Sequence, residues 1–405
     1  MNKGTLIIGA GQGAAQAAIS LRQLKYDAPI TIIGEEPYLP YQRPPLSKGY
    51  LSGALSENEV YLKPAEFWQK FNITIKTNTI ARSINIDEKQ ILFDDDNSVE
   101  YENLIIAIGT RPRQLNCPGA DLLQVHSLRS LSDANRLKDA FSVGKDIVII
   151  GGGYVGLECA ASAIKKRMNV TLIEAEARIL ARVAGRQVSE FFVEEHRRAG
   201  VDIRLSQQVI ALHGDIDVEG VELSSGEILP ADLVLVGIGA ITNDELAKDA
   251  GLECDDGIVV DEFCQTSQDN IYAIGDVTRH PNSIYDTDIR LESVHNAIEQ
   301  GKTAAFSIVG KAKPYSQVPW FWSDQYDLKL QTAGLSSNHD QVIVRGDPLK
   351  RKFAVFYLRN KRLIACDAVN SPSEYMAARM LIGKQDCPDV DMLADPLIAM
   401  KELLS

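Results

Sequence analysis

The sequence predicts an α/β fold with two Rossmann-like dinucleotide-binding domains, one inserted in the other, plus a C-terminal α+β domain. Two glycine fingerprints, each between an apolar strand and a helix, are the first reason. The second is that each fingerprint is followed by a later apolar strand that ends in glycine, at 104–109 and at 233–239. The third is a change near residue 315, after which short strands and a single helix replace the alternation of strands and helices.

The more complete fingerprint is a GxGxxG turn that follows the apolar run 147–150. Gly151 is needed for the tight turn, Gly153 lets the backbone approach a pyrophosphate, and Gly156 lets the helix lie close to the strand. Glu174 ends the next strand, at the spacing where a carboxylate accepts hydrogen bonds from an adenosine ribose. Because this carboxylate would repel a 2′-phosphate, we expect NADH to be preferred over NADPH.

The first dozen residues repeat this design as GxGxxA. Gly9, Gly11 and Ala14 occupy the three fingerprint positions, and Glu35 follows the next apolar strand as the expected ribose ligand. A single fingerprint is weak evidence, because an ordinary glycine turn gives the same letters. Two fingerprints in one chain are far more specific, so we expect two dinucleotide sites.

Composition excludes several classes of protein. The formal charge of −13 argues against a nucleic-acid partner, and no apolar run is long enough to span a membrane. We therefore expect a cytoplasmic protein. The cysteines have no CxxC pair or metal-ligand spacing, so we expect reduced thiols, no disulfide and no bound metal. They are Cys117, Cys159, Cys254, Cys264, Cys366 and Cys387.

Three further segments carry residues suited to a bound cofactor. A proline-stiffened loop brings Arg43 and Lys48 to fixed positions, although solvated charges on a surface loop are the simpler interpretation. An apolar strand delivers Asp276 at a glycine turn, where an ordinary turn aspartate is the alternative. Trp322 lies in an aromatic run at 319–326, and such residues are more often part of a core than of a cofactor site.

These segments resemble one family. EEPYLPYQRPPLSK at 35–48, IYAIGDV at 271–277 and PWFWSDQY at 319–326 are similar to segments of the NADH-dependent ferredoxin reductases of oxygenase systems, the putidaredoxin-reductase and rubredoxin-reductase group. The resemblance covers nearly the whole chain. The FAD ligands expected from it and from the fingerprints are Gly9, Gly11, Ala14, Glu35, Arg43, Lys48, Ala107, Arg111, Asp276, Val294 and Trp322. The corresponding NADH ligands are Gly151, Gly153, Gly156, Glu158, Glu174 and Gly239.

The resemblance implies a glutathione-reductase-like architecture of three domains. Residues 1–112 and 242–314 would bind FAD, residues 113–241 would bind NADH, and residues 315–405 would form the α+β domain. In that last domain we expect a helix with a capping box, in which Ser371 is the N-cap and Glu374 is at N3.

The expected reaction is hydride transfer from NADH to FAD, followed by transfer of single electrons to an external carrier. There is no cysteine before Cys117, which excludes a disulfide reductase. The family implies a [2Fe–2S] ferredoxin, or a rubredoxin, that serves an oxygenase such as a cytochrome P450 or a ring-hydroxylating dioxygenase. A reductase of the monodehydroascorbate type, or a signalling flavoprotein like apoptosis-inducing factor, is the alternative.

Two predictions concern charge. The resemblance supports positions near the flavin for Lys48 and Glu158, and we expect them to form an ion pair beside the site of hydride transfer because a buried charge is tolerable only when it is paired. A solvated Lys48 in the loop and a Glu158 on the helix surface are the alternative. From Arg290 to Arg362 there are 12 Lys and Arg residues against 6 Asp and Glu residues, or +6, in a chain of net charge −13. We expect this interval to attract an acidic ferredoxin, with Lys350, Arg351 and Lys352 at the docking site.

Overall fold

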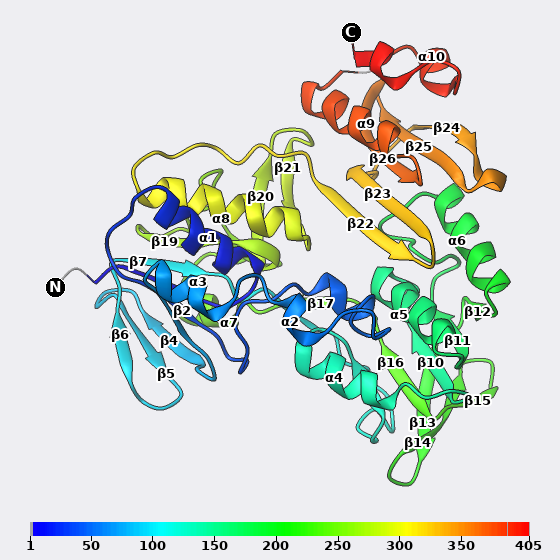
Figure 1. Ribbon diagram of the computed structural model, residues 1–405, viewed down its shortest axis with the longest axis horizontal. Helices are drawn as coiled ribbons and strands as arrows, with labels where there is room; N and C mark the ends of the chain where they lie inside the picture. Colours follow the sequence, from blue (N-terminus) through cyan, green and yellow to red (C-terminus); the bar gives the residue numbers. More distant parts are fainter. Residues whose placement is uncertain (1–2, 387, 405) are drawn as a thin grey trace. The chain divides into compact units, whose positions relative to one another are not determined.

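A computed structural model describes residues 3–386 and 388–404 (Figure 1). The chain forms two compact units. The first comprises Met1–Gln42, Asn58–Arg111 and Ile241–Pro319, and the second comprises Arg43–Glu57, Pro112–Ala240 and Trp320–Ser405. The proline-stiffened loop thus belongs to the second unit, together with the predicted NADH-binding and C-terminal segments. The division into three domains stays a prediction.

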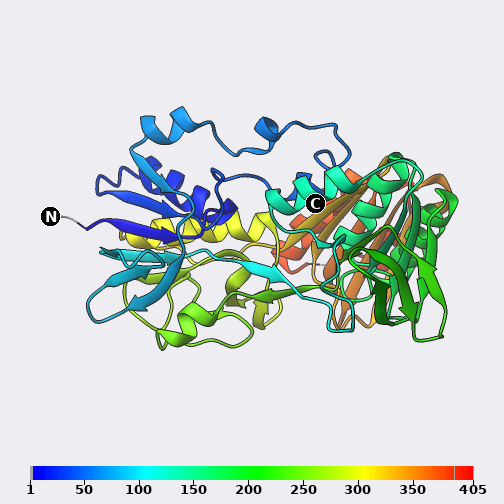
Figure 2. The ribbon, with the colours of Figure 1, turned by 90° about the horizontal axis from the view of Figure 1, so that it is seen from below.

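The first unit is built on a parallel sheet in the order β19-β7-β1-β2-β3. The strands are β1 (Thr5–Ile8), β2 (Ile30–Ile33), β3 (Ile73–Lys76), β7 (Asn103–Ile106) and β19 (Ile271–Ala273). Helices α1 (Gln12–Gln23) and α8 (Val294–Ile308) lie side by side in both views (Figures 1 and 2). Their close approach depends on glycine, because a Cβ atom on Gly301 would lie 2.8 Å from the carbonyl oxygen of Gly13.

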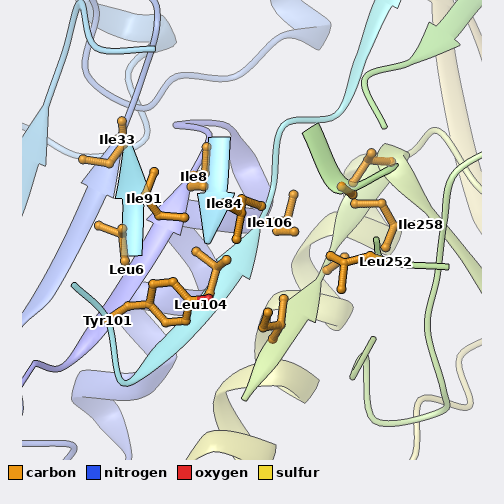
Figure 3. Packing of buried hydrophobic residues seen from close by; sticks show 14 of the residues in the cluster. Leu6, Ile8, Ile33, Ile84, Ile91, Tyr101, Leu104, Ile106, Leu252 and Ile258 are labelled. Carbon is orange, nitrogen blue, oxygen red and sulfur yellow. The ribbon is translucent and has the colours of Figure 1, made fainter. Parts of the chain in front are cut away.

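Alternate residues of the sheet strands enter different cores, as the two-residue period of a strand requires. Leu6, Ile8, Leu104 and Ile106 pack with residues of β4 and β5 in the cluster of Figure 3. Ile7 instead packs with the apolar residues of α1. Both faces of the sheet are therefore buried, as the continuous apolar runs predict.

The remaining elements of the first unit are short. A second sheet contains β4 (Ala81–Asn85), β5 (Gln90–Phe93) and β6 (Ser98–Glu100), and a third contains β18 (Ile258–Val259), β20 (Thr278–Asn282) and β21 (Thr287–Arg290). The helices are α2 (Glu57–Val60), α3 (Ala65–Lys70), α7 (Glu245–Asp249) and the 3-10 turn η2 (Gly275–Val277). Short strands β8 (Thr110–Pro112) and β17 (Ala240–Thr242) lie where the chain passes between the units.

The second unit repeats the parallel arrangement in the order β12-β11-β10-β16-β9. Strand β10 pairs with β11 and β16 as β1 pairs with β2 and β7, which confirms the predicted duplication. The strands are β9 (Val125–Ser127), β10 (Asp146–Ile150), β11 (Asn169–Glu174), β12 (Asp202–Leu205) and β16 (Leu233–Val236). The accompanying elements are η1 (Pro44–Ser47), α4 (Leu131–Ala140), α5 (Tyr154–Lys165), α6 (Arg186–Arg198), β13 (Val209–Gly214), β14 (Val218–Leu223) and β15 (Ile228–Pro230).

The C-terminal part of this unit is an antiparallel sheet in the order β22-β23-β26-β25-β24. Its elements are β22 (Trp320–Gln325), β23 (Leu328–Gly334), β24 (Gln341–Asp347), η3 (Pro348–Lys350), β25 (Lys352–Arg359), β26 (Arg362–Val369), α9 (Pro372–Lys384), α10 (Val390–Ala394) and η4 (Met400–Leu404). The expected α+β character of this part is confirmed.

The predicted capping box at the start of α9 is wrong. Ser371 is the N-cap residue, but its side chain accepts no capping hydrogen bond. Its hydroxyl donates instead to the carbonyl oxygen of Val369, and Glu374 pairs with the guanidinium of Arg345. A capping box does occur at α4, where the side chain of Ser130 accepts from the backbone N–H of Asp133. Serine hydroxyls choose between such local partners, and sequence spacing alone does not decide which one is taken.

Over the part of the chain that the structure describes, no helix is long and apolar enough to cross a membrane. The same residues contain no group of His, Cys, Asp and Glu side chains arranged to hold a metal ion. Five of the six cysteines are free thiols, and Cys387 lies outside the described residues.

Candidate functional site: two dinucleotide cradles and a buried ion pair

The fingerprint at the start of α5 has the geometry that its three glycines predict. Gly151 has a φ of +110°, and a Cβ atom there would lie 2.3 Å from the carbonyl oxygen of Gly237. A Cβ atom on Gly156 would lie 2.1 Å from the carbonyl oxygen of Gly151. A Cβ atom on Gly153 would meet nothing within 4 Å. Gly151 and Gly156 are therefore required by the fold, whereas Gly153 keeps the helix N-terminus open for a ligand.

Glu174 is held at the mouth of this turn. One carboxylate oxygen accepts a hydrogen bond from the backbone N–H of Gly152 at 2.7 Å, and the other accepts from the N–H of Glu176 at 2.8 Å. The nearby Arg178 is turned away, because its guanidinium donates to the carbonyl oxygens of Ala184 and Ala181 and to a serine hydroxyl. The turn thus presents the carboxylate of Glu174, and the guanidinium of Arg178 is bonded elsewhere.

Gly239 ends the segment that follows β16. Its φ is +104°, and the guanidinium of Arg182 lies 3.3 Å from the position of a Cβ atom there. This backbone conformation favours glycine, so local geometry alone explains why a glycine occupies this position. Its predicted contact with NADH stays a prediction.

The fingerprint at the start of α1 has the same geometry. Gly9 has a φ of +102°, and a Cβ atom there would lie 2.3 Å from the carbonyl oxygen of Ala107, whereas a Cβ atom on Gly11 would meet nothing within 4 Å. Ala14 is buried against the sheet. Glu35 is exposed after the end of β2. Its placement is compatible with the expected contact to a ribose.

Asp276 lies in a turn whose backbone is held from α8. The N–H of Gly275 donates to the side-chain carbonyl of Gln300 at 2.7 Å. The first residue of that helix is Val294, which follows the N-cap Ser293. Helix α8 thus positions both predicted FAD ligands: Val294 is its first residue, and Gln300 holds the turn that carries Asp276.

Two predicted cationic FAD ligands are engaged within their own units. Arg111 forms an ion pair with Glu245 at 2.6 Å and donates to the side-chain carbonyl of Asn243 at 2.9 Å. Arg43 donates to the carbonyl oxygen of Arg129 at 2.6 Å. Both guanidinium groups are therefore fixed in position, and their contacts with FAD stay predictions.

The predicted ion pair between Lys48 and Glu158 is confirmed. The ammonium nitrogen lies 2.8 Å from Oε2 of the carboxylate, and the two side chains are 16% and 3% exposed. Ser47 also donates to Oε2, and Ser323 donates to Oε1 at 2.6 Å. Every partner of this buried carboxylate is a donor, which is the arrangement that a buried anion requires.

Burial and hydrogen bonding act on Glu158 in opposite directions. Removal from water raises the pKa of this carboxyl group, and this is the largest effect. The charge and hydrogen bond of Lys48 lower the pKa, as do the hydroxyl groups of Ser323 and Ser47. The carboxylate thus depends on its three donors to remain ionised.

Aromatic rings surround the start of α5. The rings of Tyr154 and Phe321 are stacked with centroids 4.4 Å apart, and burial raises the pKa of the Tyr154 hydroxyl. Trp322 is half-buried and lies 5.5 Å from the ring of Trp320. The aromatic run of β22 therefore packs against α5, and the predicted contact of Trp322 with FAD stays a prediction.

Sequence reasoning missed Ser47, Ser323 and Tyr154. Ser47 immediately precedes Lys48, and Tyr154 lies four residues before Glu158, one helical turn away. These two positions carried a usable signal. Ser323 carried none, because it lies 165 residues from Glu158 and reaches it only through the packing of β22 on α5.

The predicted docking interval 290–362 is less uniform than its composition suggests. Its two parts belong to different compact units. Arg345 is buried and bonds to carbonyl oxygens of the C-terminal segment, and Arg351 pairs with Asp327 and Glu195. Lys350 is 81% exposed. Lys350 and the exposed Lys352 thus remain the better candidates for an acidic partner.

The N-terminal turns of α1 and α5 both have the geometry needed to bind a dinucleotide. In each, the second fingerprint glycine is the residue before the first helical turn and faces open space, where free N–H groups and the helix dipole favour a pyrophosphate. This arrangement, repeated in two parallel sheets, defines an oxidoreductase of the class that binds two dinucleotides.

The chain belongs to the pyridine nucleotide-disulphide oxidoreductase family, whose model matches residues 3–301, and residues 320–404 match the reductase C-terminal family. A ferredoxin–NAD(P)(+) reductase of a Sphingomonas species is 43% identical over 99% of this chain and 97% of the relative. Putidaredoxin reductase of Pseudomonas putida is 38% identical over 100% and 97%. The putidaredoxin reductase in a crystal structure of its covalent complex with putidaredoxin has a TM-score of 0.97 at 38% identity, covering 100% of this chain and 98% of that one.

Members of this family use FAD and NAD(P)H. The chain is therefore an FAD-dependent oxidoreductase that uses a pyridine nucleotide. The expected fold class is also confirmed, since the family and the structural neighbours share it.

Proposed function

We propose that this enzyme takes a hydride from NADH onto FAD and passes single electrons to a [2Fe–2S] ferredoxin that serves an oxygenase, such as a cytochrome P450 or a ring-hydroxylating dioxygenase. One observation carries the choice of acceptor. The matching family is named for oxidoreductases that act on disulphides, but the first 116 residues of this chain contain no cysteine. An acceptor outside the chain is then needed, and the relatives named above are reductases of ferredoxins.

When bound, NADH supplies the hydride and FAD converts a two-electron donor into a source of single electrons. The chain's own residues bind and orient. The N–H groups at the start of α5 would bind the NADH pyrophosphate beside Gly153, and Glu174 would accept a hydrogen bond from the adenosine ribose. Lys48 and Glu158, with the hydroxyls of Ser47 and Ser323, form a fixed set of charges at the nicotinamide end of α5. In the proposed roles, Lys48 would favour negative charge on the reduced flavin, and Glu158 would limit how strongly that charge is held.

The preference for NADH follows from the surroundings of Glu174. A 2′-phosphate on a ribose bound by Glu174 would meet the negative charge of this carboxylate, and Glu176 follows two residues later. Arg178 has its guanidinium bonded elsewhere and offers no compensating charge. Repulsion between the phosphate and these carboxylates supports NADH as the substrate.

We also propose that the protein acts in the cytoplasm. The buried thiols of Cys159, Cys264 and Cys366 have pKa values raised by burial, so they are poor nucleophiles and need no oxidising compartment. Their burial is consistent with a structural role.

The test is reduction of cytochrome c by NADH in the presence and absence of a ferredoxin. Ferricyanide is a poor probe, because any reduced flavin reduces it. We expect cytochrome c reduction to depend on an added [2Fe–2S] ferredoxin of an oxygenase system and to saturate with its concentration. Equal rates without the ferredoxin, or turnover with monodehydroascorbate alone, would contradict the proposed acceptor while leaving NADH oxidation intact.

A further inference from the structure

His196 is the only histidine of α6 and is completely buried. Its Nε2 atom lies 2.8 Å from Oε1 of Gln325, and its Nδ1 atom lies 2.9 Å from the hydroxyl of Tyr326. Burial lowers the pKa of the imidazole to about 4, so the ring is neutral at physiological pH. Both ring nitrogens therefore have defined roles, one as donor and the other as acceptor.

The contacts of Gln325 extend this pair to the active-site carboxylate. The side-chain nitrogen of Gln325 donates to the hydroxyl of Ser323 at 3.1 Å, and that hydroxyl donates to Glu158 at 2.6 Å. Gln325 and Ser323 are 1% and 0% exposed. A buried chain of four hydrogen bonds thus connects the turn at Tyr326 with the ion pair of Glu158.

The negative charge of Glu158 determines which group donates and which accepts in each of these four hydrogen bonds. A carboxylate only accepts, so the hydroxyl of Ser323 must donate to Glu158 and accept from the amide nitrogen of Gln325. The amide oxygen then faces His196, whose Nε2 must carry the proton. Nδ1 is left as an acceptor for the hydroxyl of Tyr326. Bonds that point the same way polarise one another, and all of these direct their donors towards Glu158.

We propose that His196 and Gln325 are positioning residues that act through Ser323 to orient the carboxylate of Glu158 and keep it ionised beside Lys48. The inference rests on the proposed role of this ion pair in NADH oxidation. This series of hydrogen bonds is not a proton path, because the amide of Gln325 has no ionisable proton to pass on. It acts by polarisation and by fixing the carboxylate oxygen that Lys48 leaves unoccupied.

The charged and titratable groups around these four hydrogen bonds are compatible with a neutral His196. Next to it on α6, Glu195 is compensated by Arg198 and by Arg351, whose guanidinium lies 3.1 Å from the carboxylate. Around Glu158, the titratable groups are Lys48 from the loop and Tyr154 and Cys159 on the same helix. Lys48 is the cation among them, so the remaining stabilisation must come from hydroxyl and amide donors.

The backbone at Tyr326 belongs to a two-residue hairpin loop. Its φ is +57°, a conformation that bulky residues rarely adopt, at the turn between β22 and β23. The hydroxyl bond to His196 and the ring contact with it, with centroids 5.0 Å apart, hold the side chain in this place. The hairpin accounts for the positive φ, and the contacts with His196 fix where the side chain of Tyr326 lies.

The first measurement is the pH dependence of flavin reduction by NADH in stopped flow. The rate falls in acid as Glu158 takes up a proton. In His196→Asn, whose shorter side chain does not reach Gln325, we expect the apparent pKa of this fall to rise by about one unit. His196→Gln can place an amide nitrogen near the position of Nε2 and should largely restore the wild-type profile. Ser323→Ala, which removes the donor itself, should shift the profile furthest.

The second measurement does not depend on turnover. Isotope-edited infrared spectra of the oxidised holoenzyme, without NADH, report the protonated carboxyl group of Glu158, which is assigned by its loss in Glu158→Gln. We expect this band to appear at higher pH in His196→Asn than in the wild type. Nitrogen NMR of the six histidines should show His196 as a neutral ring with the proton on Nε2. Both readouts remain meaningful even if the electron acceptor is not a ferredoxin.

Ser371→Ala is the matched control, since it removes a buried hydroxyl of the same unit whose partner, the carbonyl oxygen of Val369, lies outside this hydrogen-bond network. It should leave both the pH profile and the infrared band unchanged. If His196→Asn destabilises the fold, Tyr326→Phe, at a 38% exposed position, removes only the last donor and should give a smaller shift in the same direction. Unchanged Glu158 ionisation in folded His196→Asn and Tyr326→Phe, or a proton on Nδ1 in the wild type, would overturn the proposal.

Discussion

Replacing Lys48 with methionine tests the ion pair most directly. The substitution keeps a long side chain but removes the ammonium group that lies 2.8 Å from Glu158. Glu158 is 3% exposed, so it loses its cation without gaining water. Removing one partner of a buried ion pair costs about 3–5 kcal/mol when the other charge remains. The two serine hydroxyls that still donate to Glu158 place this variant at the lower end, near 3 kcal/mol.

Protonation limits this loss and makes it depend on pH. The carboxyl group can avoid an unpaired charge by taking up a proton, which at pH 7 costs about 1.36 × (7 − 4.3), or ~3.7 kcal/mol, and at pH 5 costs only ~1 kcal/mol. In the variant the folded-state pKa of Glu158 is raised further above its unfolded value. The deficit relative to the wild type is therefore small near the unfolded pKa and grows as pH rises towards the folded pKa.

The assays are stopped-flow reduction of the flavin by NADH and thermal unfolding at several pH values. We expect FAD to remain bound and flavin reduction to slow by about 100-fold, the effect of losing one preorganised charge in an active site. The melting temperature of the variant should approach that of the wild type towards pH 5. Lys138→Met is the control, because it removes a lysine of the same unit that lies over the ring of Tyr50 and is not among the groups that shift the pKa of Glu158. Wild-type reduction rates in Lys48→Met would refute a catalytic role for the pair.

Three further outcomes are expected. Glu174→Ala combined with Ala175→Arg should narrow the preference for NADH over NADPH in kcat/KM, and equal use of both by the wild type would contradict the assignment. Reversal of Lys350 and Lys352 to glutamate should lower the ferredoxin-dependent rate and its sensitivity to salt, whereas an unchanged salt series removes these lysines from the docking surface. Gly153→Val should weaken NADH binding at least tenfold in titrations without lowering the melting temperature, because its Cβ position is open in the fold.

The parts of the site that follow from spacing were predictable from sequence. The fingerprint glycines are required by backbone geometry within a few residues, and Glu174 follows because a parallel strand must end near the turn. The ion pair of Lys48 and Glu158 was predictable because a buried charge needs a partner and because the family resemblance supports the positions of both residues. The roles of these residues towards the bound cofactors remain predictions.

The rest depends on packing between distant segments. His196 and Gln325 are 129 residues apart and meet because α6 lies against the start of the C-terminal sheet. No periodicity in either segment marks this contact. The alternation of Ser323 and Gln325 along β22 shows that they share a face, but not which helix that face meets. At Ser371 the residue types fit a capping box, but the hydroxyl donates to the carbonyl oxygen of Val369 instead.

The two helices that follow the glycine fingerprints, α1 and α5, have different side-chain partners at equivalent positions. Counted from the first glycine of each turn, Glu158 on α5 corresponds to Gln16 on α1, and Ser162 corresponds to Ser20. On α1 the two side chains bond to each other, with the amide of Gln16 donating to Ser20 at 3.0 Å. On α5 both reach another segment, since Glu158 pairs with Lys48 and Ser162 donates to the carbonyl oxygen of Ser47. Substituting a carboxylate for an amide at one position thus requires a cation, and the loop that supplies it is held by the serine one turn later.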